Sequence, residues 1–434
     1  SGPAGGVVGA SAVARSAGLE KFINLDIGGT SSDVSRYSGS FAYQSSHQVG
    51  DARVANVALR IETVAAGGGS ICGVENGLLR VGPQSAGAHP GPACYGFGGP
   101  LCLTDVNLLL GRLDPSQFST PVDPSASRAR LQEIAGDFGL SEDDLLHGFL
   151  AVADDAMATA ISKVSVAEGY DPADHALVSF GGGGGQHACG VATRLGISKI
   201  LSPGDSGLLS AYGLMQARLE RVKEESVLLP VGDARLGEIE KRLIADALSS
   251  VPHADAEVAQ KYAFVRLVGQ DAPLEVPYND LSDIHSLYEA RFRQVFGYFP
   301  ENRQAEVHSL RVLAVGPSSD SPSESFAVSD EPEVSGTSIH FRDDLSVGAQ
   351  LIGPCLVTDS FGALWIEAGW RATKGDRGSL LLEKTESSPL STPEFPEVAK
   401  RELFANRLLG LAEEMGAQLE RTALSVNVRE RLDF

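Results

Sequence analysis

The sequence predicts an α/β protein, and three observations carry this prediction. Apolar strand-like runs alternate with helical stretches up to about residue 218, glycine clusters interrupt them at 67–69, 96–99 and 181–185, and glycine becomes sparse beyond about residue 220. The alternation is typical of an α/β domain, and the change in composition indicates a smaller α+β unit after it. A terminal helix completes the expected fold. The expected segments are 1–222, 223–385 and 386–434.

Three apolar runs of the first segment are expected to form buried strands: "FINLDI" (22–27), "ALVSF" (176–180) and "ISKILS" (197–202). The stretch 141–169 opens with Ser141, carries acidic residues in its first turn and keeps apolar residues at helical spacing. Because a serine cap and early acidic residues are typical of a helix start, this stretch is predicted to form one long helix.

The second segment is expected to contain a helix at 235–251 and strands at 261–269 and 272–278. Two stretches, 315–338 and 385–397, are rich in Ser, Pro and acidic residues. Such stretches cannot bury enough apolar surface to order themselves, so both are expected to be loops or linkers.

The last stretch, 398–425, is predicted to form an amphipathic helix, because its apolar residues recur at helical spacing. We expect this helix to have a packing partner beyond residue 434. Its apolar stripe passes through Leu403, Leu408, Leu411, Met415 and Leu419.

Composition and charge restrict the class of protein. The chain has 434 residues, of which 43% are hydrophobic and 21% charged, as expected for a globular protein of two or three domains. No run approaches the ~20 consecutive apolar residues that a membrane-spanning helix needs. The net charge of −21 repels nucleic acid and anionic lipid, so neither is an expected partner. Because the sequence opens directly on "SGPAGGVVGA", which is typical of a domain interior, we expect a piece of a longer protein.

The cysteines are an odd and scattered set without a CxxC pair: Cys72, Cys94, Cys102, Cys189 and Cys355. This pattern favours reduced thiols over a disulfide framework or a zinc site, and therefore predicts a cytoplasmic protein. Cys189 enters an apolar helical stretch, so it is expected to be a small buried hydrophobe, with a reactive thiol as the alternative.

The motif "NLDIGGTSSDVS" (24–35) is the first candidate binding element. An apolar strand runs into Asp26 and then into a glycine pair that lets backbone amides approach an anion. Asp26 and Asp33 are candidate catalytic residues, and Asp26 is the first candidate to hold Mg²⁺ through water. A tight turn without a ligand is the alternative. The candidate phosphate-binding residues are Gly28, Gly29, Thr30 and Ser31.

The second candidate element is "ALVSFGGGGGQHACGVATRLGI" (176–197), in which a buried strand enters five glycines and leaves into a helix. Such dense glycine indicates unusual torsions or close approach of a ligand, and the helix start offers free amides. The spacing matches neither GxGxxG nor GxxxxGK[ST]. Nucleoside binding is the preferred interpretation, and a structural glycine turn is the alternative. The candidate residues are Gly182, Gly183, Gly184, Gly185 and Gln186.

Two further glycine-rich stretches, 63–73 and 82–113, are expected to be ordered loops near a site or long connectors. His89 and Asp105 are the most notable polar residues of the second loop. His89 is a candidate catalytic residue, with a structural hydrogen-bonding role as the alternative, and His187 follows a glycine cluster at a helix start. No carboxylate pair and no Ser/His/Asp set stands at a spacing that by itself indicates hydrolysis.

Seven strings follow one another along the chain: "SGPAGGVVGA", "DIGGTSSDVS", "TVAAGGGS", "GPQSAGAHPGPACYGFGGP", "TDVNLLLGRL", "SFGGGGGQHACGVATRLGI" and "SGLLSAYGL". In this order they resemble the hydantoinase A and 5-oxoprolinase family. That family in turn resembles the actin, hexokinase and Hsp70 superfamily of ATPases, so the resemblance implies an actin-like, ribonuclease H-like core. The tail from Leu403 to Phe434 is similar to the start of the hydantoinase B region, which favours the fused 5-oxoprolinase type.

The resemblance also implies roles for the motifs. Residues 1–12 and 206–214 look like the two connecting helices, 26–33 looks like the second phosphate hairpin, and Gly182–Gly185 looks like the adenosine motif. Only one DxGGT string is present, although the superfamily also has a first phosphate hairpin. We therefore expect this piece to bind nucleotide weakly and not to turn over alone.

The chemistry that the resemblance implies is ATP-driven opening of a cyclic amide, with ATP and Mg²⁺ as cofactors. Phosphorylation of the amide oxygen would make the ring carbon electrophilic, and 5-oxoproline would yield glutamate, a step of glutathione metabolism. The implied partners are the lactam and the remaining hydantoinase A and B regions of the same protein. A homodimer and a potassium requirement are left open. The alternatives are an ATP-dependent hydantoinase, an acetone carboxylase-type subunit, or a non-catalytic nucleotide-gated module.

Overall fold

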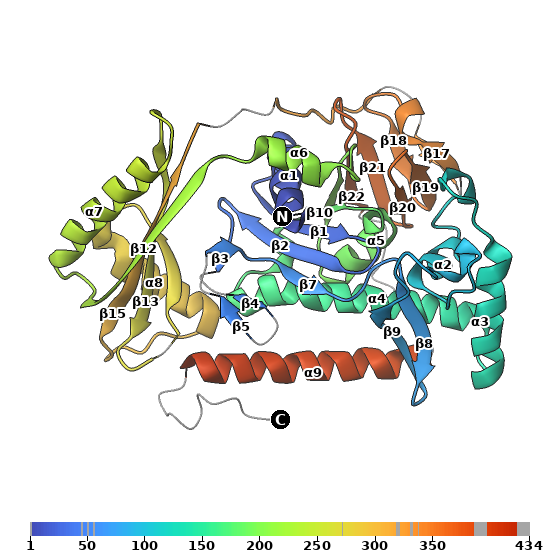
Figure 1. Ribbon diagram of the computed structural model, residues 1–434, viewed down its shortest axis with the longest axis horizontal. Coiled ribbons are helices and arrows are strands. Elements are labelled where there is room, and N and C mark those ends of the chain that lie inside the picture. The colour runs from blue at the N-terminus through green and yellow to red at the C-terminus, as the bar shows by residue number, and fades with distance from the viewer. Residues whose placement is uncertain are drawn as a thin grey trace. The chain divides into compact units, whose positions relative to one another are not determined.

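A computed structural model of the protein describes residues 2–44, 47–49, 52–54, 57–270, 272–317, 322–329, 333–336, 338–385 and 397–422 (Figure 1). The chain divides into two compact units. Unit 1 comprises Ser1–Val166, Asp171–Met215 and Ser321–Leu408, and unit 2 comprises Ala167–Tyr170, Gln216–Asp320 and Leu409–Phe434. Each unit has its own buried apolar core.

Unit 1 is built on a mixed nine-stranded sheet. Its centre is parallel, because β1 pairs with β10 and β10 with β11 in the same direction, whereas β2 and β22 flank these strands antiparallel. The strands in spatial order are β16 (Val334–Ser335), β18 (Gln350–Ile352), β21 (Trp370–Lys374), β22 (Leu380–Lys384), β11 (Lys199–Ser202), β10 (Ala176–Phe180), β1 (Lys21–Ile27), β2 (Ser32–Ser38) and β7 (Glu62–Val64).

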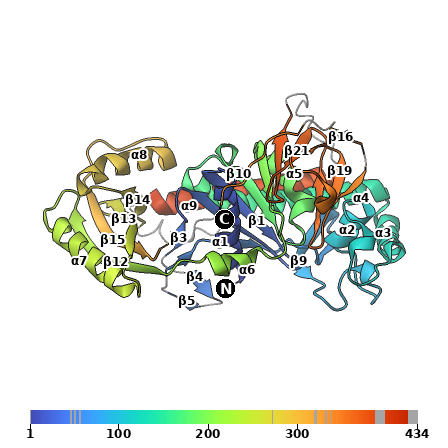
Figure 2. The same cartoon turned by 90° about the horizontal axis from the view of Figure 1, so that it is seen from above.

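Strand β1 shows how the sequence divides the two faces of this sheet. Side chains alternate along a strand, so Ile23, Leu25 and Ile27 enter one core while Phe22, Asn24 and Asp26 face the other side. Figure 1 shows α1 and α6 over the second face and α4 over the first (Figure 2 gives the view from above). The helices are α1 (Gly2–Ser16), α4 (Glu142–Val164), α5 (Gly184–Arg194) and α6 (Leu209–Gln216).

The predicted long helix is confirmed as α4, which begins after Ser141. The Ser141 Oγ accepts a hydrogen bond of 3.0 Å from the Asp144 amide, and three acidic residues occupy the first turn, where the helix dipole favours negative charge. Within the part of the chain that the structure describes, the stretch Glu142–Glu168 passes the length and apolarity test for a membrane span, and 78% of its most apolar window is buried inside the protein. That burial is typical of a core helix.

Smaller elements complete unit 1. β8 and β9 form a hairpin, and β17, β19 and β20 form a small sheet. Their bounds, with those of the remaining elements, are α2 (Leu103–Leu109), α3 (Pro124–Phe138), β3 (Tyr43–Gln44), β4 (His47–Val49), β5 (Ala52–Val54), β6 (Ala58–Leu59), β8 (Ser70–Glu75), β9 (Leu78–Ser85), β17 (Ile339–Phe341), β19 (Cys355–Thr358) and β20 (Ala363–Ile366).

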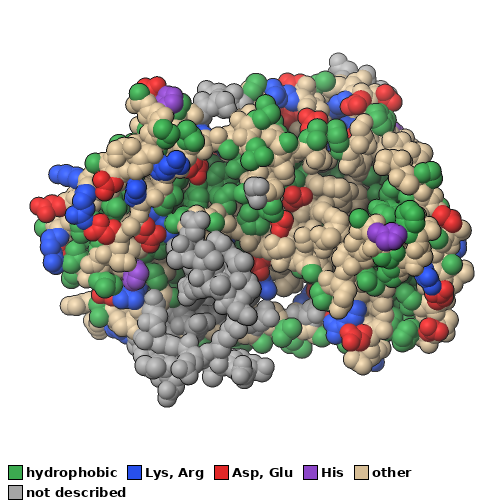
Figure 3. Space-filling view, viewed as in Figure 1, with side chains coloured by type: hydrophobic (Ala, Val, Ile, Leu, Met, Phe, Trp, Pro, Cys, Tyr) green, Lys and Arg blue, Asp and Glu red, His purple; other side chains and the backbone are tan. Residues whose placement is uncertain are grey.

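Unit 2 is an antiparallel four-stranded sheet with two helices, as the sequence predicts for an α+β unit. Charges of both signs alternate over α7 (Figure 3), and Arg242 pairs with Glu225 there. Inside the unit, buried Arg311 pairs with Glu224 at 2.8 Å and lies over the Phe264 ring. The elements are β12 (Glu220–Pro230), β15 (Ala305–Val315), β13 (Glu257–Leu267), β14 (Leu274–Tyr278), α7 (Arg235–Ser250) and α8 (Ile284–Phe296).

The terminal helix is α9 (Glu397–Thr422). Of the predicted apolar stripe only Leu403 is buried, together with Ala399, while the other four residues of the stripe are exposed. Two ion pairs fasten the first part of the helix to unit 1: Glu402 with Arg80, and Arg407 with Asp155. The apolar spacing therefore predicted the helix but not how much of its stripe is covered.

The bounds of the two compact units differ from those of the expected segments 1–222, 223–385 and 386–434. The division of the chain into these three domains stays a prediction. Residues from 321 onward return to unit 1, because β22 pairs with β11 and so extends the first sheet. Where it is described, the stretch 315–338 has no helix or strand apart from the end of β15 at Val315 and β16, as expected for a loop. Most of 385–397 lies outside the described residues.

Candidate active site

The two glycine-rich motifs meet at one edge of the central sheet. β1 and β10 run parallel with Asp26 opposite Phe180, so the turns that follow these strands lie side by side. The Gly183 amide donates a hydrogen bond of 2.9 Å to the Ile27 carbonyl and joins the two turns directly. Ligands of open α/β sheets bind outside the carboxyl ends of the strands, and this is where the two motifs converge.

Two carboxylates face each other at this edge. Asp26 on β1 is in register with Asp33 on β2, and Thr63 Oγ1 donates a hydrogen bond of 2.6 Å to Asp33 Oδ1. Burial, followed by the negative charge of Asp33, raises the pKa of Asp26 to about 6. The hairpin therefore holds a partly desolvated carboxylate beside a second one, a donor set that suits a hard cation.

The turn between β1 and β2 is closed by a hydrogen bond of 2.9 Å from the Gly28 amide to the Ser31 carbonyl. Gly29 and Thr30 at its tip are exposed, so their backbone is accessible to a ligand. The glycine loop 67–69 supports this turn from behind, because the Gly68 and Gly69 amides donate to the carbonyls of Gly28 and Gly29 at 3.1 and 2.6 Å. The glycine loop 67–69 thus fixes the β1–β2 hairpin.

In the second turn, Gly181 has φ +80°, and a Cβ on it would lie 2.3 Å from Asp26 Oδ1. Position 181 therefore accepts only glycine, because a side chain there would collide with the Asp26 carboxylate. Gly182 differs from the three glycines after it, because it is exposed and nothing lies within 4 Å of where its Cβ would be. Gly183 and Gly185 approach Ile27 and Ala363 too closely for a side chain, and Gly184 lies tightly against Ser179, 3.1 Å from where its Cβ would be.

Gln186 is buried and supports the glycine turn. Its side-chain amide donates to the carbonyls of Gly182 at 3.0 Å and Ala363 at 3.3 Å. The amide hydrogens are directed at the backbone, so in this structure the candidate nucleoside residue shapes the turn. The structure is thus compatible with both interpretations of the glycine cluster. Gly183–Gln186 make structural contacts, and Gly182 is open to a ligand.

The two expected connecting helices, α1 and α6, pack closely on the face that carries Asp26. A Cβ on Gly213 would lie 1.8 Å from the Gly5 carbonyl oxygen and 2.6 Å from the Gly9 amide nitrogen. A Cβ on Gly6 would lie 3.2 Å from Asp26 Oδ2, so α1 passes directly over the carboxylate. The small residues of both helices thus allow backbone contact next to the candidate site.

The loop 82–113 is organised by Asp105. Its buried carboxylate accepts hydrogen bonds from the amides of Ala93 (3.0 Å), Cys94 (2.8 Å) and Cys102 (2.8 Å) and from Ser127 Oγ (2.6 Å). Four donors on one carboxylate are a structural arrangement, since they leave it little capacity for a ligand.

His89 lies exposed on this loop, with its ring 5.5 Å from that of Phe97. The loop is linked to the β1–β2 hairpin through Gly69, because the Ala86 amide donates a hydrogen bond of 2.9 Å to the Gly69 carbonyl. A catalytic role of His89 stays a prediction.

His187 belongs to a buried polar network behind the glycine turn. Its Nδ1 lies 2.7 Å from Asp154 Oδ1 and its Nε2 lies 3.1 Å from Asn107 Nδ2, and Arg194 pairs with the other Asp154 oxygen at 3.0 Å. Because Asn107 can only donate through Nδ2, the contacts favour His187 with its proton on Nδ1. Burial alone would raise the pKa of Asp154, but Arg194 and His187 outweigh it and lower that pKa.

Sequence reasoning did not single out Asp154. The available signal was an Asp-Asp pair at 154–155 inside an otherwise apolar helix. A buried charge has to be paired, so the two aspartates indicated an internal ionic network.

The five cysteines are all free and buried. Cys189 is 2% exposed, which confirms the prediction that it is a small buried residue.

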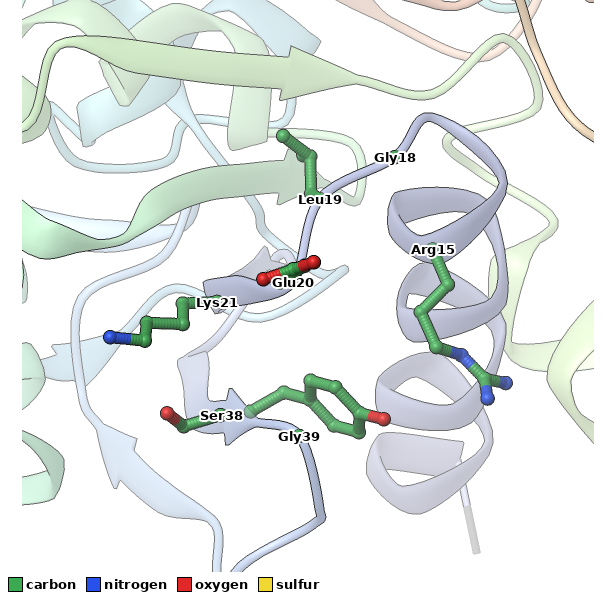
Figure 4. A pocket seen from close by; sticks show the side chains of 8 residues that line it. Arg15, Gly18, Leu19, Glu20, Lys21, Ser38 and Gly39 are labelled. Carbon is green, nitrogen blue, oxygen red and sulfur yellow. The ribbon is translucent and has the colours of Figure 1, made fainter.

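A separate hollow of about 560 Å³ lies at the opposite end of β1. Figure 4 shows that the side chains of Arg15 and Lys21 extend away from each other, so the polar groups of this hollow do not converge. Ligand sites need a few convergent polar groups, and for this reason the edge at Asp26 is the better candidate. Among the described residues, no group of three or more His, Cys, Asp or Glu side chains forms a metal cluster.

Comparison with known proteins identifies relatives over the whole chain. Residues 1–223 match the family described as hydantoinase/oxoprolinase, and residues 398–434 match the family described as hydantoinase B/oxoprolinase. A 5-oxoprolinase, PfmaA of Pestalotiopsis fici, is 36% identical over 100% of this chain, and 5-oxoprolinase 1 of Arabidopsis thaliana is 32% identical over 100%. The chain spans 37% and 38% of the length of these two relatives.

A solved structure has the same fold. The ATP-dependent caprolactamase from Pseudomonas jessenii superposes with a TM-score of 0.79 at 24% identity, over 88% of this chain and 61% of that one. The mixed sheet with its flanking helices, the smaller α+β unit and the terminal helix thus confirm the predicted α/β fold class, and the solved structure shares this fold.

Proposed function

This chain belongs to the hydantoinase/oxoprolinase family, and we propose that it forms the ATP-binding part of an enzyme that opens a cyclic amide with hydrolysis of ATP. One observation carries the proposal: the β1–β2 hairpin and the glycine turn after β10 meet around Asp26. Accessible backbone, hydroxyls and paired carboxylates at one edge are the groups that a bound triphosphate needs.

Different residues of the two turns would bind the phosphates, the Mg²⁺ ion and the nucleoside. The turn Gly28–Ser31, whose tip is exposed at Gly29 and Thr30, would bind the β- and γ-phosphates through the backbone amides and hydroxyl at that tip. Asp26 and Asp33 would hold Mg²⁺, which would neutralise the charge of the phosphates. The fit rests on the raised pKa of Asp26, since two carboxylates this close are stabilised by a cation between or beside them. Gly182 would lie against the nucleoside.

A lactam resists water because resonance stabilises its amide. Transfer of the γ-phosphoryl group to the amide oxygen would make the ring carbon electrophilic and the oxygen a good leaving group. The contribution of this chain is to position the phosphates and to stabilise their charge. His89, on the loop linked to the hairpin through Gly69, is the proposed further catalytic residue.

We propose 5-oxoproline as the substrate and glutamate as the product, because the relatives that match the whole chain include several named 5-oxoprolinase. Another relative is named caprolactamase subunit alpha, so a larger lactam is the alternative substrate. Reduced, buried cysteines support a cytoplasmic location.

The remaining regions of the complete protein are proposed to supply the first phosphate hairpin and most of the hydantoinase B part. α9 is the proposed contact with the latter, because it starts the hydantoinase B match and leaves Leu408, Leu411 and Met415 exposed. Contiguous exposed apolar side chains are typical of a surface that another segment covers.

The test is coupled ADP release by the complete protein. 5-Oxoproline, hydantoin, ε-caprolactam, and acetone with bicarbonate are compared at equal concentration, with and without Mg²⁺. Stimulation by 5-oxoproline supports the proposal, and a response to hydantoin alone would change the substrate. Absence of lactam-stimulated ATP hydrolysis, together with tight ATP binding, would favour a nucleotide-gated interaction module.

A further inference from the structure

The turn between β19 and β20, residues 359–362, is held unusually firmly. The Asp359 carboxylate accepts hydrogen bonds from the amides of Phe361 (2.8 Å) and Gly362 (2.9 Å), and the Asp359 amide donates 3.0 Å to the Gly362 carbonyl. These three bonds determine the backbone of the turn. The phenyl group of Phe361 is therefore presented from a rigid support.

A buried arginine secures the same turn from inside. Arg342 pairs with Asp359 at 2.9 Å and is 4% exposed. Its guanidinium also donates to Ser202 and to the carbonyls of Pro203 and Gly378. A buried ion pair with this many hydrogen bonds fixes one conformation, since moving either partner leaves a charge uncompensated.

The turn lies directly against the glycine turn of the candidate site. A Cβ on Gly362 would be 3.8 Å from the Gly182 carbonyl oxygen, and Gln186 donates to the Ala363 carbonyl at 3.3 Å. Arg342 and Asp359 line one small cavity together with Gly181 and Ser206. The β19–β20 turn and the glycine turn after β10 therefore pack against each other at the edge of the sheet where Gly182 is exposed.

Phe361, in the β19–β20 turn, is partly exposed to solvent. The residue is 41% exposed although it is large and hydrophobic. It lies against Gly207, where a Cβ would be 2.9 Å from the Phe361 Cβ and 3.4 Å from its Cγ and Cδ1, so the glycine leaves room for the side chain. The turn that approaches the Gly182 carbonyl through Gly362 thus carries an exposed aromatic residue at the preceding position.

We propose that Phe361 is a nucleotide-binding residue and that its ring stacks on the base of bound ATP. This inference rests on the proposed function and adds to it the residue that recognises the base. Every base has a π-face, so stacking on an aromatic side chain suits a nucleotide without requiring hydrogen-bond readout. The phosphates would then be held at the β1–β2 hairpin, and Gly182, whose carbonyl the Phe361-bearing turn approaches, would lie against the nucleoside.

The experiment measures binding of ATP and of inorganic tripolyphosphate to the complete protein by calorimetry. Phe361→Ala is expected to weaken ATP binding by about ten-fold and to leave tripolyphosphate binding unchanged, because only the base contacts the ring. Phe138→Ala is the matched control, since Phe138 is also an exposed phenylalanine (47%) at the end of α3. That control is expected to bind both ligands as the wild type does.

A spectroscopic variant gives a readout that a structural role would not produce. In Phe361→Trp, the fluorescence in excess of that of wild type, which carries Trp365 and Trp370, is expected to be quenched by ATP but not by tripolyphosphate, because stacking on adenine quenches indole. Unchanged ATP affinity in Phe361→Ala, or fluorescence of Phe361→Trp that ignores ATP, would overturn this inference alone. Wild-type protein that binds neither ligand would overturn the proposed function as well.

Discussion

Asp26 lies directly opposite Asp33 across the β1–β2 hairpin, and burial together with this second carboxylate raises the pKa of Asp26 to about 6. A free carboxyl group titrates near 4, so the folded protein holds the Asp26 proton more firmly than the unfolded chain does. This contribution to stability is fully present below about pH 4 and is lost as the pH rises through 6. At neutral pH the charged pair therefore destabilises the fold.

We predict that Asp26→Asn raises the melting temperature at pH 7.5 while it abolishes turnover of the complete enzyme. The gain in unfolding free energy is expected to be on the order of 1–3 kcal/mol at pH 7.5 and to disappear near pH 4. Thermal melts at the two pH values check this. A variant that keeps wild-type turnover would show that the hairpin is only a turn.

Gly181→Ala and Gly182→Ala are predicted to separate the structural from the ligand-facing glycines. Gly181→Ala puts a Cβ 2.3 Å from Asp26 Oδ1 at a positive φ, so it should destabilise the fold by about 1–3 kcal/mol and stop ATP hydrolysis. Gly182→Ala meets nothing within 4 Å, so its stability should stay within about 0.5 kcal/mol of the wild type.

ATP affinity is the second readout for this pair. If Gly182 lies against the nucleoside, its new methyl group weakens ATP binding although the fold is unchanged. Equal ATP affinity of Gly182→Ala and wild type would remove Gly182 from the proposed binding site.

Gly213→Ala is expected to disturb the contact between α1 and α6. The added Cβ would lie 1.8 Å from the Gly5 carbonyl oxygen, and overpacking of this kind costs about 1–3 kcal/mol. Gly136→Ala in α3 is the matched control, because nothing lies within 4 Å of its Cβ position and alanine favours a helix by about 1 kcal/mol. Chemical denaturation compares the two, and destabilisation of equal size in both would argue against a specific α1–α6 contact.

The neighbouring residues Asp154 and Asp155 are predicted to respond in opposite directions to loss of their charge. Asp154→Asn removes the partner of buried His187 and of Arg194, and should cost about 3–5 kcal/mol at neutral pH. The low pKa of Asp154 makes this contribution present above about pH 4 and lost as the pH falls further.

Burial raises the pKa of Asp155 in spite of Arg407, so Asp155→Asn should be neutral or stabilising at pH 7. Urea unfolding of the two variants side by side tests the difference in sign. A large loss of stability in Asp155→Asn would mean that its pair with Arg407 outweighs the burial of its charge.

Much of the fold could be predicted from local patterns. The strand "FINLDI" and the helix from Ser141 are visible in the sequence because alternation and capping are local properties. The return of residues beyond 321 to the first sheet could not be predicted in this way. Pairing of β22 with β11 joins strands far apart in the chain, and no local pattern specifies such a partner.

The candidate site shows the same division. The DIGGT and GGGGGQ motifs pointed to a phosphate turn and a glycine turn, but the roles of single residues depended on their neighbours. Gln186 turned out to brace the turn, and Asp105 to organise a loop, because their hydrogen-bond partners come from other segments. Phe361 carries no motif and became notable only because the turn that carries it lies against the glycine turn at Gly182.

The sequence by itself determined the α/β class, the two glycine-rich turns and the family of this protein, because these follow from short-range periodicity and from strings of adjacent residues. Only the tertiary structure decided which residues share the site. Parallel pairing of β1 with β10 sets Asp26 beside Gly181, and the β19–β20 turn adds Phe361 from more than a hundred residues away. Such convergence depends on hydrogen-bonded register and packing between distant segments, which the order of residues along the chain does not display.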